Sequence, residues 1–134
     1  MRETARSILI VDDHEDTLKL YSQVLLRNGY EVAIARDGEE ALEWIDKYPP
    51  NLVVLDIMMP SLNGWEVCRR IKNTPALSSV IVLIVSSGIR RDGALQQLAS
   101  ECGAVEVVPK PLSPPELLTK IKTYLKNPPS RSAA

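Results

Sequence analysis

The sequence contains no phenylalanine, one histidine and two cysteines among its 134 residues. One histidine and two distant cysteines, Cys68 and Cys102, do not supply the four ligands of a zinc site. Two cysteines within helix-like patterns also do not make the disulfide framework of a small secreted domain. We therefore expect two reduced, partly buried thiols in a cytoplasmic protein.

Long apolar runs and an excess of charge of one sign are also missing. No run reaches the roughly 18 apolar residues that span a bilayer, and the N-terminus lacks the apolar region of a secretory signal. The chain has 16 basic and 17 acidic residues, which gives a formal net charge of −1. This balance provides no general attraction to nucleic acid or anionic lipid. We expect no membrane partner and no direct nucleic-acid partner.

The apolar residues occur in five short runs that alternate with segments of helical periodicity. Most runs are nearly continuous in Val, Ile and Leu, which is typical of parallel strands covered on both faces. The alternation predicts an α/β fold with a doubly wound, five-stranded parallel sheet in a three-layer (βα)5 sandwich. We expect residues 1–126 to form this domain and residues 127–134 to be a flexible tail or the start of a linker. The predicted strands are 8–11, 31–35, 52–55, 80–85 and 105–108.

Turn and capping residues mark the ends of the predicted helices. Gly29 and Gly103 stand where a helix is expected to end in the left-handed conformation. Asp37 and Asn63 are predicted N-caps because each is followed three residues later by a glutamate. Ser113 precedes proline, which is tolerated at the first helical position.

Polar residues follow four of the predicted strands at their carboxyl ends, the edge where doubly wound sheets bind ligands. Two carboxylates about 5 Å apart repel by about 3 kcal/mol at an effective dielectric constant of about 20. Several carboxylates on one edge therefore require that one of them takes up a proton or that a divalent cation binds. Oxygen ligands select Mg²⁺, with Mn²⁺ or Ca²⁺ as alternatives, over zinc. The polar residues are Asp12, Asp13, Asp56, Ser86 and Lys110.

Asp56 is the candidate for covalent chemistry. A carboxylate beside Mg²⁺ can act as a ligand, a base or a nucleophile. Attack on phosphorus would form an acyl phosphate, whose added charge of about −2 needs neutralising partners besides the metal. Lys110 supplies an ammonium group and Ser86 a hydroxyl donor. The set therefore suits phosphoryl acceptance better than cation binding alone.

These residues and their spacings resemble the receiver domain of bacterial two-component response regulators, over residues 6–126. The resemblance implies that Asp56 is phosphorylated and that Asp12 and Asp13 hold Mg²⁺ together with it. The backbone carbonyl of Met58 matches the main-chain ligand of the family. The resemblance also implies the strand order 2-1-3-4-5.

The resemblance assigns further roles and partners. Ser86 matches the switch hydroxyl, Lys110 matches the lysine that contacts the phosphoryl group, and the Lys110–Pro111 peptide is expected to be cis. A sensor histidine kinase or phosphotransfer protein would supply the phosphoryl group. A downstream protein would bind the face of helix 4 (around residues 95–102), strand 5 (105–108) and helix 5 (around residues 117–125). A weak homodimer is compatible with the family. Such a domain is a signalling switch rather than an enzyme, although it assists its own phosphorylation and dephosphorylation.

Three positions lie outside this pattern. Val107 stands where the family usually carries Tyr or Phe, which predicts weaker or differently built coupling from Asp56 to that face. His14 is interpreted as a polar residue that opens the first helix. The basic segment 88–93 is interpreted as solvated charge, with docking of a partner as the alternative.

Three other functions fit the sequence less well than that of a receiver. A magnesium phosphatase of the haloacid dehalogenase type needs a second acid two residues after its nucleophile, where this chain has Met58. A flavodoxin-like FMN protein needs a first loop rich in Ser, Thr and Gly, which the acidic stretch 12–16 is not. A degenerate receiver that acts only as a binding module should lack a site residue, and none is missing.

Overall fold

The computed structural model describes residues 6–57, 64–87, 97 and 100–126. The predictions for Met58, Asn63 and residues 88–93 fall outside these residues. Residues 100–102 are helical. The strands are β1 (Ser7–Val11), β2 (Glu31–Ala35), β3 (Leu52–Leu55), β4 (Ile81–Ser86) and β5 (Glu106–Pro109). The helices are α1 (Glu15–Arg27), α2 (Gly38–Lys47), α3 (Gly64–Lys72) and α5 (Pro114–Lys126), with a short 3₁₀ turn at Pro75–Leu77.

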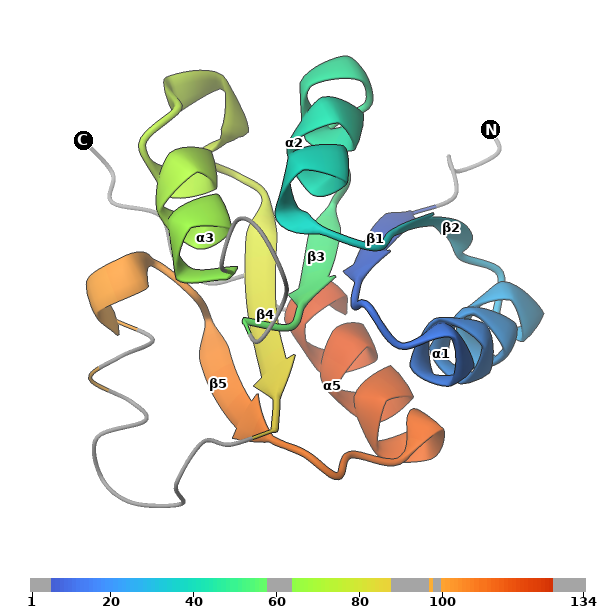
Figure 1. The fold of residues 1–134 in the computed structure, drawn as a ribbon. Helices are drawn as coiled ribbons and strands as arrows, with labels where there is room; N and C mark the ends of the chain where they lie inside the picture. Colours follow the sequence, from blue (N-terminus) through green and yellow to red (C-terminus); the bar gives the residue numbers. More distant parts are fainter. Residues whose placement is uncertain (1–5, 58–63, 88–96, 98–99, 127–134) are drawn as a thin grey trace.

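The five strands form one sheet in the order β2-β1-β3-β4-β5, and every neighbouring pair is parallel. This confirms the predicted fold class and strand order. The chain reverses direction across the sheet between β2 and β3, so β1 and β3 lie side by side at its centre, with Val11 opposite Leu55 (Figure 1). The carboxyl ends of β1, β3, β4 and β5 therefore meet at one edge.

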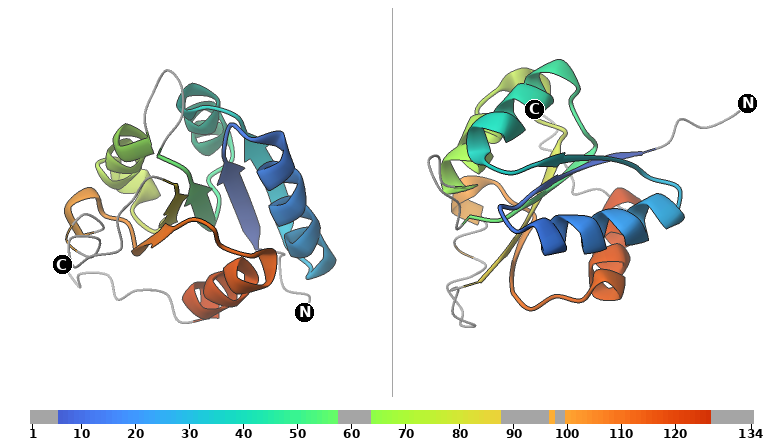
Figure 2. Two further views of the ribbon diagram at one scale, coloured as in Figure 1. Left: turned by 60° about the horizontal axis from the view of Figure 1, so that its bottom comes forward. Right: turned by 45° about the vertical axis from the view of Figure 1, so that its right-hand side comes forward.

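Helices cover both faces of the sheet, and the alternation of side chains along each strand supplies both cores. Leu9 and Val11 of β1 pack in the cluster that includes residues of α2 and α3, whereas Ile8 and Ile10 pack in the cluster formed with α1 and α5. Figure 2 shows α1 and α5 together on one side of the sheet, with α2 and α3 on the other. Both faces of β1 are therefore buried, as its continuous apolar sequence predicts.

The predicted caps are largely present. Gly29 and Gly103 both have φ of +89°, the left-handed conformation expected of them. At the start of α5, Ser113 Oγ accepts a bond from the backbone N–H of Glu116 at 3.2 Å, and the Glu116 carboxylate accepts one from the N–H of Ser113. Asp37 caps α2 by accepting from the Glu40 N–H at 2.8 Å.

The structure differs from the prediction at three strands. β1 begins one residue earlier than expected, at Ser7, and β4 and β5 begin and end one residue later. The N–H of Val80 bonds to the carbonyl of Leu77, so this residue lies in the turn that follows the 3₁₀ segment rather than in β4. Ser86 stays in the ladder because its carbonyl accepts from the N–H of Lys110 at 2.9 Å. Over the described residues, every helix is too short or too polar to cross a membrane.

Candidate functional site

The backbone of the sheet continues past the strand ends and holds the polar residues in place. The N–H of Asp12 bonds to the carbonyl of Ala35 at 3.1 Å, and the N–H of Asp56 bonds to the carbonyl of Val11 at 3.0 Å. Each acidic residue is thus fixed by a neighbouring strand rather than by its own loop. Sheet hydrogen bonds give such side chains a positional precision that a surface loop does not.

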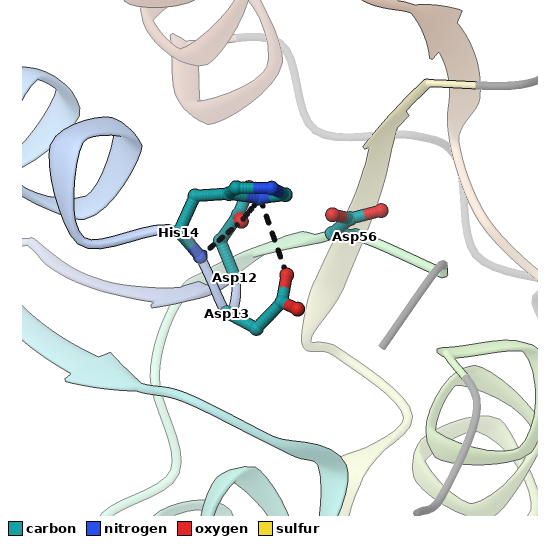
Figure 3. Close-up of side chains that lie close together, drawn as sticks. All are labelled: Asp12, Asp13, His14 and Asp56. Atoms are coloured by element: carbon teal, nitrogen blue, oxygen red, sulfur yellow. Dashed lines mark hydrogen bonds and ion pairs between the residues drawn. The ribbon is translucent and has the colours of Figure 1, made fainter. Parts of the chain in front are cut away.

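The three carboxylates lie together at the carboxyl ends of β1 and β3. Asp12 is 3% exposed and Asp56 is 2% exposed, whereas Asp13 lies at the surface. Figure 3 shows these side chains with His14 beside them, and one ligand atom from each of the four lies within 4.8 Å of all the others. Two nearly buried carboxylates and a third nearby are costly unless positive charge compensates them.

Lys110 supplies part of that compensation from the end of β5. Its Nζ lies 2.6 Å from Asp12 Oδ2 and 3.5 Å from Asp56 Oδ2, with the lysine side chain 17% exposed. Burial lowers the pKa of Lys110, but the hydrogen bond to Asp12 and the charges of Asp12 and Asp56 outweigh it. The pKa therefore stays above its usual value, and the ammonium is charged at neutral pH.

Ser86 completes the inner wall of the site. It is fully buried at the end of β4, and its hydroxyl donates a short hydrogen bond to Asp56 Oδ1. Asp56 is thus held by a neutral donor on one oxygen and approached by an ammonium on the other. These two contacts fix the position of the carboxylate.

His14 lies closer to the acids than its interpretation as a plain helix-opening residue suggests. Its Nδ1 is 3.0 Å from Asp12 Oδ1 and 3.2 Å from Asp13 Oδ1. The hydrogen bond to Asp12 and the negative charges of Asp13 and Asp12 raise the pKa of the imidazole. No sequence pattern signalled this contact, because the ring orientation follows from the turn after β1.

Two supporting contacts also escaped sequence analysis. A Cβ atom on Gly64 would lie 2.5 Å from Ile57 Cα and 2.7 Å from the carbonyl oxygen of Asp56, so only glycine allows α3 to begin this close to Asp56. On the other side, the hydroxyl of the buried Tyr21 donates to the carbonyl of Leu112 at 2.8 Å. This bond ties the turn after Lys110 to α1.

The donor set and the charge fit a hard divalent cation. Three carboxylates and one ammonium leave a formal charge of −2 on the described site, and the oxygens of Asp12, Asp13 and Asp56 are ligands suited to Mg²⁺ or Mn²⁺. The Lys110–Pro111 peptide is cis, as the resemblance implies. The arrangement can thus hold a cation beside an anchored carboxylate and an ammonium group. These are the groups that phosphoryl transfer requires.

Comparison with known proteins assigns the family. The model of the response regulator receiver domain matches residues 8–122. The chain belongs to this receiver domain family. It is 40% identical over 121 residues to a Vibrio cholerae protein named "Probable cyclic di-GMP phosphodiesterase", which covers 90% of this chain and 27% of that protein.

Other relatives carry the same domain. The receiver domain is 36% identical over 122 residues to the alkaline phosphatase synthesis transcriptional regulatory protein PhoP of Bacillus subtilis, covering 90% of this chain and 49% of that protein. The chain thus spans half or less of the length of these curated relatives. The crystal structure of a CheY-like receiver domain protein from Methanospirillum hungatei superposes with a TM-score of 0.80 at 32% identity, covering 92% of this chain and 95% of that one.

Val107 stands where the resemblance to the family implies Tyr or Phe. The side chain is 5% exposed and packs in the cluster that includes Ile84 and Cys102. Cys102 and Cys68 are both buried and carry no disulfide, and the Cys68 thiol donates to the carbonyl of Cys102 at 3.1 Å. The buried residue at position 107 is therefore a small aliphatic one.

Proposed function

We propose that this receiver domain accepts a phosphoryl group on Asp56 from a phosphohistidine of a histidine kinase or phosphotransfer protein. The observation that carries the proposal is the anchoring of one carboxylate by Ser86 and Lys110 at the centre of an acidic cluster. A phosphatase with an aspartyl intermediate would need a general acid, and Met58 offers none at the expected position.

In the proposed reaction an oxygen of the Asp56 carboxylate attacks phosphorus. The O–P bond forms as the N–P bond breaks, and the leaving imidazole keeps the electron pair of the broken bond. The buried environment strengthens every charge interaction that stabilises the transferring group. Lys110 lies where its ammonium can turn from Asp56 to a phosphoryl oxygen, because it already lies 3.5 Å from Oδ2.

The fit of the acidic cluster supports Mg²⁺ as the cofactor. Asp12, Asp13 and Asp56, together with the backbone carbonyl of Met58, would hold the ion. When bound, it would supply positive charge against the phosphoryl oxygens and balance the carboxylates. The contacts between Lys110 and Asp12 keep one oxygen of Asp12 occupied and so orient the other.

Phosphorylation would redistribute the contacts of Ser86. Its hydroxyl now donates to Asp56 Oδ1, and after phosphorylation a phosphoryl oxygen is the stronger acceptor. Movement of Ser86 at the end of β4 would bias the surface formed by β5, α5 and the helix that includes residues 100–102, where a downstream protein would bind. We propose a cytoplasmic signalling switch without activity toward another substrate, with residues 127–134 as a tail or linker.

The experiment is incubation with a small-molecule phosphodonor and Mg²⁺, followed by mass spectrometry of the intact protein. The wild type should gain one phosphoryl group that hydroxylamine removes, and Asp56→Asn should gain none. Omission of Mg²⁺ should abolish the reaction. Equal yield of the adduct in Asp56→Asn would refute the assignment, and no adduct in wild type would favour a constitutive binding module.

A further inference from the structure

His14 is the one residue of the cation cluster that is not a carboxylate. Its Nδ1 lies 3.0 Å from Asp12 Oδ1 and 3.2 Å from Asp13 Oδ1, and all three atoms belong to the group whose members lie within 4.8 Å of one another. Figure 3 shows the ring beside both aspartates. The imidazole nitrogen therefore shares the space in which a cation would sit.

These separations match neighbouring ligands around a single ion. Ligands at right angles on an octahedron with bonds of about 2.1 Å lie about 3.0 Å apart, and nitrogen bonds to borderline divalent metals have the same length, about 2.0–2.1 Å. The pairs from Nδ1 to Asp12 and to Asp13 both have this spacing. No large rearrangement is needed for Nδ1 to become a ligand beside the two oxygens.

The backbone holds the imidazole at this position. His14 occupies the N-cap of α1 in an extended conformation, and its N–H donates to Asp12 Oδ1 at 2.9 Å. The same Asp12 carboxylate is held from the other side by Lys110, through Oδ2. Asp12 therefore presents Oδ1 toward His14, while the ring, with its side chain 66% exposed, can turn without displacing the core.

We propose that Nδ1 of His14 is a ligand of the cation in this receiver domain, so that the site favours Mn²⁺, Co²⁺ and Ni²⁺ over Mg²⁺ more strongly than three carboxylates would. Imidazole nitrogen suits borderline transition metals, whereas Mg²⁺ prefers oxygen ligands. The inference rests on the cation site of the proposed function. A metal ligand must be the neutral imidazole, so ligation would require Nδ1 without a proton.

The test compares the two kinds of ion in the full chain, metal-free and without an affinity tag. Titration calorimetry with MgCl₂ and with NiCl₂ should give tighter binding of Ni²⁺ in the wild type. In His14→Ala the Ni²⁺ affinity should fall by about 10-fold or more, and the Mg²⁺ affinity should change much less. In the matched control Asp13→Asn, both affinities should fall together.

A spectroscopic readout decides ligation independently of affinity. Pulsed electron paramagnetic resonance of the Mn²⁺-loaded protein should show nuclear modulation from an imidazole nitrogen. Because His14 is the only histidine of the chain, ¹⁵N labelling of histidine must change that signal, and His14→Ala must remove it. An unchanged ratio of Ni²⁺ to Mg²⁺ affinity in His14→Ala, or the absence of the modulation, overturns the inference.

The outcomes separate this inference from the proposed function. Wild type that binds Mg²⁺ and becomes phosphorylated, without a histidine signal, retains the proposed function and loses the His14 ligand. Wild type that binds neither Mg²⁺ nor Ni²⁺ loses both.

Discussion

The Nζ atom of Lys110 lies 2.6 Å from Oδ2 of Asp12, although the two residues are 98 positions apart. The ammonium is nearer to this carboxylate than to Asp56, 3.5 Å away. Without a cation, Lys110 therefore offsets the charge of Asp12 first and that of Asp56 second. The contact between Lys110 and Asp12 therefore contributes to the stability of the folded domain as well as to the chemistry of the site.

Replacing Lys110 by methionine should lower the free energy of unfolding of the metal-free domain by about 3 kcal/mol, because it leaves Asp12 buried without its partner. Saturating Mg²⁺ should recover part of this loss, since a cation can replace the missing charge. Urea denaturation with EDTA and with Mg²⁺ measures both effects. The matched control is Lys120→Met, whose partner Glu106 is a third exposed, with a loss below about 1 kcal/mol. Equal losses in the two variants would contradict the prediction.

Gly64→Ala should disturb the site by collision. The new Cβ would meet Ile57 and the carbonyl of Asp56, so we expect a loss of about 1–3 kcal/mol in unfolding free energy and slower phosphorylation of Asp56. Gly29→Ala is the control, because a Cβ there meets nothing within 4 Å but φ is +89°. It should cost about 1–2 kcal/mol and leave the phosphorylation rate unchanged. Rates that fall equally in both variants would contradict the steric account.

The pH dependence of stability should reveal the contact between Tyr124 and Glu106. Burial and a 2.5 Å hydrogen bond to the Glu106 carboxylate raise the pKa of Tyr124. A raised pKa in the folded state stabilises the fold below the unfolded value of about 10, and this contribution is lost as pH rises further. Urea midpoints between pH 8 and 11 should fall more steeply for wild type than for Tyr124→Phe.

The control for this titration is Tyr48→Phe, since Tyr48 is 68% exposed. Its midpoints should fall as steeply as those of wild type. Parallel curves for wild type and Tyr124→Phe above pH 10 would show that the hydrogen bond does not couple titration to folding.

Val107 should limit the response of the surface formed by β5, α5 and the helix that includes residues 100–102. The buried valine has no ring that could swing inward when Ser86 moves. Beryllofluoride, a mimic of the phosphoryl group, should therefore cause smaller amide-shift changes on β5 and α5 than in receivers with an aromatic residue there. Val107→Tyr should enlarge them, and Val108→Ile, on the opposite face, should not. Equally large changes in wild type and Val107→Tyr would refute the idea.

The strands β1, β3 and β4 were predictable from sequence because both of their faces are buried. The prediction for β2 and β3 agrees with the structure at both ends, and the left-handed glycines Gly29 and Gly103 also lie where expected. Errors at β4 and β5 arose where hydrogen bonds, not apolar composition, decide the boundary. Ser86 is polar yet remains in the sheet through its carbonyl, and Val80 is apolar yet belongs to a turn.

For the site, the sequence predicted which residues follow the ends of the strands but not how their side chains contact one another. Sequence placed the acidic residues on one edge, but it could not show that Lys110 contacts Asp12 or that His14 approaches both neighbouring acids. These contacts depend on side-chain orientation after the strands end. The need for glycine at position 64 likewise follows from the approach of α3 to β3, which no local pattern encodes.

The parallel register of the sheet has a consequence for insertions and deletions. Val11 pairs with Leu55, the last pair between β1 and β3, so Asp12 and Asp56 each follow directly after this pair. One residue added within β3 would turn the Asp56 carboxylate to the opposite face and abolish the site without removing any of its residues. Residues added to the turn between α2 and β3 would leave it intact. The effect of an inserted residue therefore depends on whether it lies within a paired strand or in a turn. Insertions placed in β3 and in the turn between α2 and β3 would compare the two cases.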